Sequence, residues 1–108
     1  MSNLTLEKMH ALQTELYEQY KEIWPPLSPA IGRDKLLWMM AEMGEVADII
    51  KKQGDANIMS NDAVRAHFIE ELCDTLLYFT YVCRCYAITT DELEQGYLAK
   101  HQKNLHRW

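Results

Sequence analysis

Apolar residues recur along the chain at the three- and four-residue spacing of amphipathic helices. The first helix is predicted from about Leu6 to Glu22, with Thr5 or Asn3 as its N-cap. The proline-rich segment 24–29 then breaks the pattern, because proline lacks an amide hydrogen and clashes with a preceding helical turn. The chain therefore begins with one helix and a sharp break.

Three further helices are predicted after this break. The second runs from about Arg33 to Gln53, and Gly54 is well placed to end it. Residues 55–60 are expected to form a short loop, with Ser60 capping a third helix over about 61–86. Residues 89–92 (TTDE) have the pattern of a capping box and predict a fourth helix that reaches the C-terminus. We therefore expect an all-α fold, a four-helix bundle that forms a single domain over residues 1–108.

The third predicted helix is apolar all the way round. Phe68 and Val82 lie on one side of it, and Ile69 and Leu76 lie on the other. A helix that is apolar on both sides is normally covered on both sides, and only three other helices are predicted here. We therefore expect a second copy of the chain to provide the missing cover, in a homodimer or a larger assembly.

Composition and charge narrow the classes of partner. The net charge is −5 and the isoelectric point is about 5.3, so the chain lacks the basic surface that binding to a nucleic acid polymer requires. The three cysteines, Cys73, Cys83 and Cys85, fall in one apolar segment and are interpreted as buried thiols. The sequence shows neither a secretory signal nor a membrane-spanning run. We expect a cytoplasmic protein with no membrane partner.

Four carboxylates fall on helix faces that are otherwise apolar. On the second helix, Glu42 lies within about 40° of Trp38 around the helix axis, and Glu45 follows about one turn later. On the third helix, Glu71 lies among valines and Asp74 shares its face one turn along. The 26 positions from Glu45 to Glu71 are enough for a helical hairpin that brings the two pairs together.

The apolar setting of these acids predicts a metal site. An acid pair three residues apart is usually a solvated helix face, but burying an uncompensated carboxylate costs several kcal/mol. The basic residues of the second helix lie near its ends and cannot neutralise all four acids. Carboxylate oxygens suit Mg²⁺, with Mn²⁺ as an alternative, and both ions bind carboxylates together with substrate phosphates.

The C-terminal helix carries a line of polar residues that includes Lys100, Asn104 and Arg107. Basic residues at a helix C-terminus also complement the helix dipole, so this interpretation stays open beside a functional one. The functional interpretation is that the three side chains contact phosphate or sugar oxygens.

Three aromatic residues, Trp24, Trp38 and Tyr78, are candidates for stacking on a nucleobase, although packing in the core would also explain each of them. Tyr78 is the best placed, because it lies one turn from Asp74 on the acidic face. We therefore include Tyr78 and Trp38 among the predicted substrate-binding residues.

Segments 41–48 (AEMGEVAD) and 70–78 (EELCDTLLY) resemble the paired motifs of the all-α nucleoside triphosphate pyrophosphohydrolases, and among them the small MazG-like proteins. The tail 100–108 is similar to the family's basic ending. The resemblance implies hydrolysis of a (d)NTP to the monophosphate and pyrophosphate, with nucleotide-pool cleaning as one possible role. It also implies assembly as dimers or tetramers. It assigns catalysis and Mg²⁺ binding to four acids: Glu42, Glu45, Glu71 and Asp74. One glutamate, with Glu45 as a candidate, would orient the attacking water.

Two positions depart from the family pattern, since Cys73 stands where many relatives carry glycine and Phe68 where some carry lysine. These two departures leave the identity of the substrate and the rate of hydrolysis open.

The acids have two rival interpretations. A di-iron carboxylate bundle needs two Glu-x-x-His pairs, and the chain has only Glu7 with His10, where Glu7 lies away from the apolar face of the first helix. A non-catalytic helical dimer that binds a nucleotide or a protein remains an alternative, because it needs the same residues.

Overall fold

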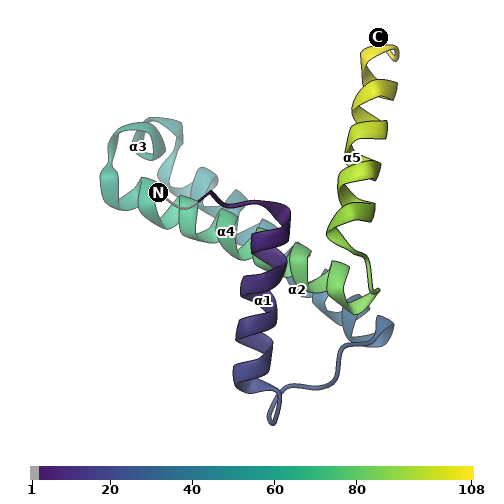
Figure 1. Cartoon of the computed structure of the whole chain (residues 1–108). Helices are drawn as coiled ribbons and strands as arrows, with labels where there is room; N and C mark the ends of the chain where they lie inside the picture. Colours follow the sequence, from purple (N-terminus) through teal and green to yellow (C-terminus); the bar gives the residue numbers. More distant parts are fainter. Residues whose placement is uncertain (1–2) are drawn as a thin grey trace.

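The computed structural model describes residues 3–108, and regular structure in this range is entirely helical (Figure 1). The all-α prediction is therefore confirmed. None of the described helices combines the length and the apolarity needed to cross a membrane. The helices, in chain order, are α1 (Leu6–Tyr20), α2 (Pro29–Gln53), α3 (Asp55–Ser60), α4 (Asp62–Cys85) and α5 (Thr90–Leu105).

Several predicted helix ends are confirmed by their hydrogen bonds. The Thr5 hydroxyl oxygen accepts from the Lys8 amide at 3.1 Å and caps α1. Gly54 ends α2 with a φ of 81°, a left-handed conformation that favours glycine. At α5 the predicted capping box is present: the Thr89 hydroxyl accepts from the Glu92 amide at 3.1 Å, and the Glu92 carboxylate accepts from the Thr89 amide at 3.0 Å.

The prediction of a loop over residues 55–60 is wrong, because this segment forms the short helix α3. A helical turn allows Ile58 to be buried, with α3 packed against both α2 and α4. Ser60 does not cap the next helix. Its hydroxyl donates to the Ala56 carbonyl at 2.7 Å within α3, and the Asn61 side chain instead accepts from two amides of α4, each at 3.1 Å. The described chain thus contains one helix more than the four predicted.

Other helix bounds move by a few residues. Helix α1 ends at Tyr20 rather than Glu22, and α4 spans 62–85 rather than 61–86. Helix α2 begins at Pro29, four residues before the predicted start, because the Ser28 hydroxyl accepts from the Ile31 amide at 3.3 Å. Proline is tolerated in the first turn, where its missing amide hydrogen costs no helical bond. The proline-rich segment therefore starts α2 as well as ending α1.

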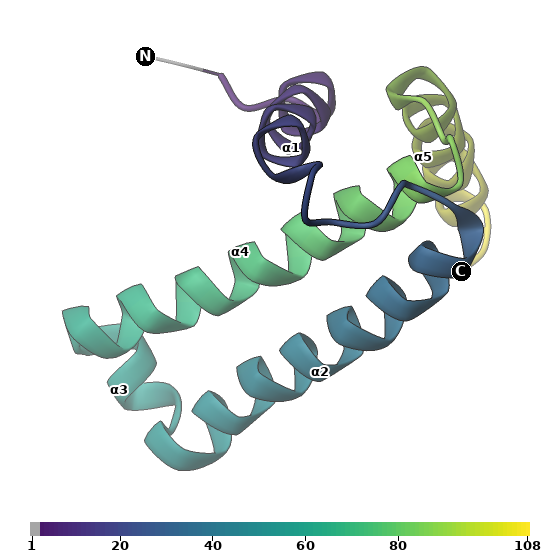
Figure 2. The same ribbon diagram turned by 90° about the horizontal axis from the view of Figure 1, so that it is seen from below.

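Helices α2 and α4 run side by side and antiparallel, and α1 crosses α4 (Figure 2). Gly32 fixes how the start of α2 meets the end of α4. A Cβ atom on Gly32 would lie 2.7 Å from the Tyr86 ring and 2.9 Å from the Cys85 Cβ, so only glycine fits without displacing α4. The hairpin is therefore held at its open end by a close helix contact and closed at the other end by α3.

Helix α5 extends away from the hairpin and packs only on α1 among the described helices (Figure 1). The radius of gyration is 16.4 Å, whereas a compact chain of this size has about 13 Å. Few apolar side chains are buried, and many large ones on α2, α4 and α5 are exposed, such as Leu37, Met40, Ile69 and Tyr97. A single copy of the chain thus leaves much apolar surface uncovered.

Candidate functional site

Three of the four predicted acids meet between the two long helices. Glu42 projects from the middle of α2, and Glu71 and Asp74 project from α4. One carboxylate oxygen from each lies within 4.8 Å of the others, and all three residues are half-buried. The antiparallel hairpin brings these acids together, since residues 29 positions apart in the sequence (71 − 42) face each other across it. The fourth acid, Glu45, is more exposed and lies outside this group of three.

The acids perturb one another electrostatically. Partial burial raises the pKa of the Glu42 carboxyl, the neighbouring Glu71 raises it further through hydrogen bonding and charge, and Asp74 and Glu45 add to the effect. Neither ion pair of residues 3–108, Lys21 with Glu18 and Lys52 with Asp48, involves the three clustered acids. A cluster of negative charge without a cationic partner is the arrangement that a divalent cation would stabilise.

The donor set fits a hard metal ion. Three carboxylate oxygens at this separation can bind Mg²⁺ or Mn²⁺, and neither ion needs the protein to fill every position, because Mg²⁺ usually keeps several waters or takes substrate phosphate oxygens. The described residues place no histidine or cysteine in this group, so softer metals that prefer nitrogen or sulfur ligands suit it less well.

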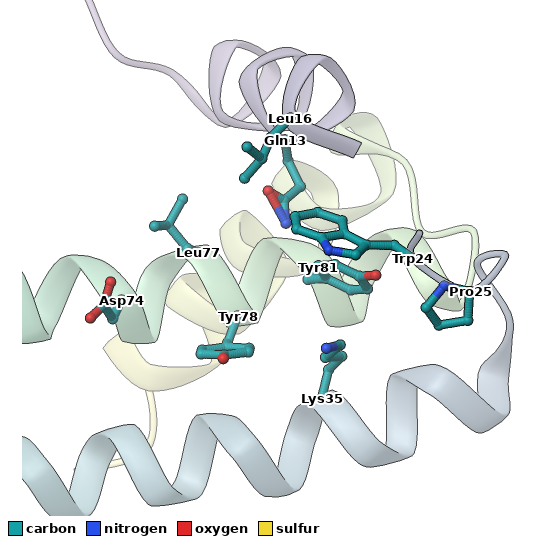
Figure 3. A pocket seen from close by; sticks show the side chains of 9 residues that line it. All are labelled: Gln13, Leu16, Trp24, Pro25, Lys35, Asp74, Leu77, Tyr78 and Tyr81. Carbon is teal, nitrogen blue, oxygen red and sulfur yellow. The ribbon is translucent and has the colours of Figure 1, made fainter. Parts of the chain in front are cut away.

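A cavity of about 260 Å³ opens beside the acids (Figure 3). Asp74 belongs to both the acid cluster and the cavity wall, so the two are continuous. This volume lies just below the range of about 300–1,000 Å³ that is usual for small-molecule pockets, so it suits one ring system rather than a whole nucleotide. The cavity is lined by Gln13, Leu16, Trp24, Pro25, Lys35, Asp74, Leu77, Tyr78 and Tyr81.

Aromatic rings form much of the cavity wall. The Trp24 ring stacks on Tyr20 with centroids 5.0 Å apart, and it lies 6.5 Å from the Tyr81 ring at a tilt of 49°. Lys35 reaches from α2 over the Tyr81 ring, with its Nζ 5.1 Å from the centroid. Burial raises the pKa of the Tyr78 hydroxyl, and the charges of Glu42 and Asp74 raise it further, so Tyr78 stays protonated at neutral pH.

A comparison with protein families matches residues 33–107 to the MazG nucleotide pyrophosphohydrolase domain. The matched segment covers more than two-thirds of the chain and includes α2 from residue 33 onward, all of α4 and all of α5. The chain belongs to the MazG family. No match was found among curated proteins or among solved structures. Membership of the MazG family indicates a hydrolase that acts on nucleotides, and it confirms the resemblance stated from the sequence.

The MazG match divides the site into two parts. The acids and Tyr78 lie inside the matched segment, whereas Gln13 and Trp24, which close the other end of the cavity, precede it. The acid end of the site therefore lies within the part of the chain that matches the MazG domain. The end formed by α1 and the segment after it lies outside that match.

The predicted substrate-binding residues fall in different places. Tyr78 lines the cavity together with Asp74, and its predicted role in stacking on a base stays a prediction. Trp38 on α2 is 58% exposed and does not line it. Lys100, Asn104 and Arg107 lie on or just after α5, which packs on α1 and not on the hairpin that carries the acids. One copy of the chain therefore does not bring these three residues to the acid cluster.

Sequence reasoning missed two polar residues of the cavity. Lys35 precedes Glu42 by seven positions, so the two share a helix face; this spacing is a signal that could have identified Lys35. The sequence pattern around Gln13 is less informative, because Gln13 is a single polar residue beside the apolar face of the first helix. It is buried where α1 packs on α4 and Trp24 folds back against α1, an arrangement that no local pattern predicts.

Proposed function

We propose that this chain is a Mg²⁺-dependent pyrophosphohydrolase that cleaves a (d)NTP to the (d)NMP and pyrophosphate, with Mn²⁺ as an alternative metal. The observation that carries the proposal is the meeting of three carboxylates within 4.8 Å, directly beside a cavity of the size of one ring system. Family membership supports the nucleotide as substrate. We propose nucleotide-pool cleaning in the cytoplasm as one role for this reaction.

In this proposal the acids hold the metal and the cavity holds the base. Glu42, Glu71 and Asp74 are the metal ligands, and Glu45, one turn along α2, completes the set or orients the attacking water. The bound metal would neutralise phosphate charge and lower the pKa of a coordinated water. Lys35 lines the same cavity but lies over the Tyr81 ring, two helical turns along α4 from Asp74, so its positive charge is at the base end of the site (Figure 3).

We further propose that the working form is a homodimer or a homotetramer. The exposed apolar surface of α2 and α4 supports assembly, because a single chain rarely leaves so many large apolar side chains in water. A second copy is also the simplest way to bring α5 to the acids of the first. Lys100, Asn104 and Arg107 would then bind phosphate or sugar oxygens across the subunit interface.

The test is pyrophosphate release from a panel of canonical and modified (d)NTPs with Mg²⁺. Wild type is expected to release pyrophosphate and the monophosphate in equal amounts, and only with metal. The variants Glu42→Gln and Glu71→Gln are expected to lose this activity, while Glu70→Gln, an exposed neighbour outside the cluster, keeps it.

Two results would count against the proposal. Metal binding without turnover of any nucleotide would favour the non-catalytic binding protein that the sequence left open. Failure to bind Mg²⁺ or Mn²⁺ would show that the clustered acids are not a metal site.

A further inference from the structure

One polar side chain in the cavity wall has no partner in the protein. Gln13 is only 4% exposed, and its Oε1 atom is buried with no hydrogen-bond partner among the described residues. Buried side-chain oxygens are nearly always hydrogen-bonded, because leaving one unsatisfied costs free energy. Gln13 lines the cavity, and Figure 3 shows its amide hanging from α1 into the space beside Trp24 and Tyr81.

The surroundings of Gln13 suit a planar heterocycle. Tyr20 stacks on one face of the Trp24 ring, so another ring can stack only on the opposite face. Tyr78 and Tyr81 supply further aromatic surface on α4, and stacking on such rings accepts any base. Aromatic stacking alone therefore gives affinity with little choice among bases, and any choice has to come from a hydrogen-bonding group.

We propose that Gln13 is the specificity-determining residue of the site and that its Oε1 accepts a hydrogen bond from an exocyclic amino group of the base. This inference rests on the proposed function, since it places the base of the nucleotide in the cavity. A glutamine amide pairs well with an amino group beside a ring nitrogen, the edge that cytosine and adenine present. For this preference the Gln13 amide has to keep its oxygen toward the base; in that orientation the carbonyl oxygen that uracil and hypoxanthine carry at the same position would face the Gln13 oxygen.

The size of the cavity supports this reading. A volume of about 260 Å³ takes the base, while the sugar and phosphates extend past Asp74 toward the metal ligands. Selection of the base and cleavage of the phosphate chain then occur at opposite ends of one continuous site. Gln13 does not touch the reacting phosphates, so its replacement should change the choice of substrate more than the chemistry.

The experiment compares two substrate pairs of equal size, dCTP with dUTP and dATP with dITP. For wild type, kcat/KM for the amino member should exceed that for the keto member by about ten-fold or more. Gln13→Met keeps the length of the side chain and removes the acceptor, so both ratios should fall to near one. Gln13→Glu keeps an acceptor at the same position and should retain the direction of the preference. Gln19→Met, at an exposed position of α1, is the matched control and should leave the ratios unchanged.

Equilibrium binding of dCMP and dUMP, followed by calorimetry, gives a readout that does not depend on turnover. Helix content and the urea midpoint of each variant establish that it folds. Turnover with a wild-type ratio of one or less, or a ratio that Gln13→Met leaves unchanged, would overturn the inference and leave the proposed hydrolase intact. Preferential dCMP binding that Gln13→Met abolishes, without hydrolysis of any triphosphate, would support the inference and overturn the hydrolase. Absence of both binding and turnover would overturn both.

Discussion

The acid end of the site is built by two helices alone, whereas the cavity end needs a third helix and the segment that follows it. Glu42, Glu71 and Asp74 are brought together by the α2–α4 hairpin, within the segment that matches the MazG family. Gln13 and Trp24 reach the same site from α1 and the following segment, before that match begins. Under the proposed function, the hairpin would carry the chemistry and α1 would carry the choice of substrate, so variants of the two regions should have separate effects.

The largest effect is expected from removing one acid of the hairpin. Glu71→Gln should weaken Mn²⁺ binding and lower kcat/KM by on the order of 100-fold or more, since changes even in groups that only support metal ligands cost 10–100-fold. The metal-free variant should be at least as stable as wild type, because one of the repelling charges has gone. Metal titration and urea unfolding of both proteins measure the two effects. Unchanged metal affinity would remove Glu71 from the site.

The next effect concerns the geometry of the hairpin. Gly32→Ala should lower the free energy of unfolding by roughly 1–3 kcal/mol, because the new methyl group overlaps the Tyr86 ring and the Cys85 side chain. Gly44→Ala, on the same helix with no atom within 4 Å of the new Cβ, is the control and should stabilise the protein by about 0.5–1 kcal/mol. Urea unfolding distinguishes the two. Equal effects would mean that the contact between the start of α2 and the end of α4 does not hold the hairpin.

A smaller effect is expected from the aromatic wall. Trp24→Leu should raise KM by about ten-fold, since base stacking on an aromatic side chain is worth about 1–3 kcal/mol, and it should leave Mn²⁺ affinity unchanged. Steady-state kinetics measures the change in KM, and a metal titration measures the Mn²⁺ affinity. Trp38→Leu, at the exposed tryptophan outside the cavity, provides the comparison. A matching loss of metal affinity in Trp24→Leu would show that the two ends of the site are not independent.

The smallest effect is a pH dependence of the acid end. Because burial and its neighbours raise the pKa of Glu42, protons compete with the metal at higher pH than they would for an unperturbed glutamate. Mn²⁺ affinity should therefore fall as the pH is lowered from neutrality toward the raised pKa, with proton release on binding. The metal-free protein should gain stability over the same range, since the folded state binds this proton more tightly than the unfolded state.

Calorimetry in buffers of different ionisation heat measures the released protons. Glu45→Gln supplies the control, because the Glu45 charge contributes to the raised pKa of Glu42 and its removal should move the fall in affinity to lower pH. An affinity that does not change with pH would place the titrating group elsewhere.

Three of the four acids that the sequence analysis singled out lie together in the structure, because the signals that place them are local. The helical spacing of the acids among apolar residues predicted that Glu42, Glu71 and Asp74 lie on facing helix surfaces. The antiparallel packing of α2 and α4 then brings them together. Helix α3 was missed, since six residues between Gly54 and Asn61 are too few to show a period. Gln13 was missed because its burial comes from tertiary packing, of α1 on α4 and of Trp24 back against α1, and not from a local pattern. The predicted role of α5 in substrate binding stays a prediction, because in one chain α5 packs on α1 and not on the hairpin that carries the acids.

The close contact at Gly32 has a kinetic consequence. Gly32 lies against Cys85, which is buried, as Cys83 is. Burial raises the pKa of both thiols, so neither thiol reacts readily while the hairpin is closed. Cys73, in contrast, is exposed in the single chain. Modification of Cys85 by a thiol reagent therefore records how often the end of α4 separates from the start of α2. Cys85 is therefore a built-in probe for the opening of the two helices that bring the acids together.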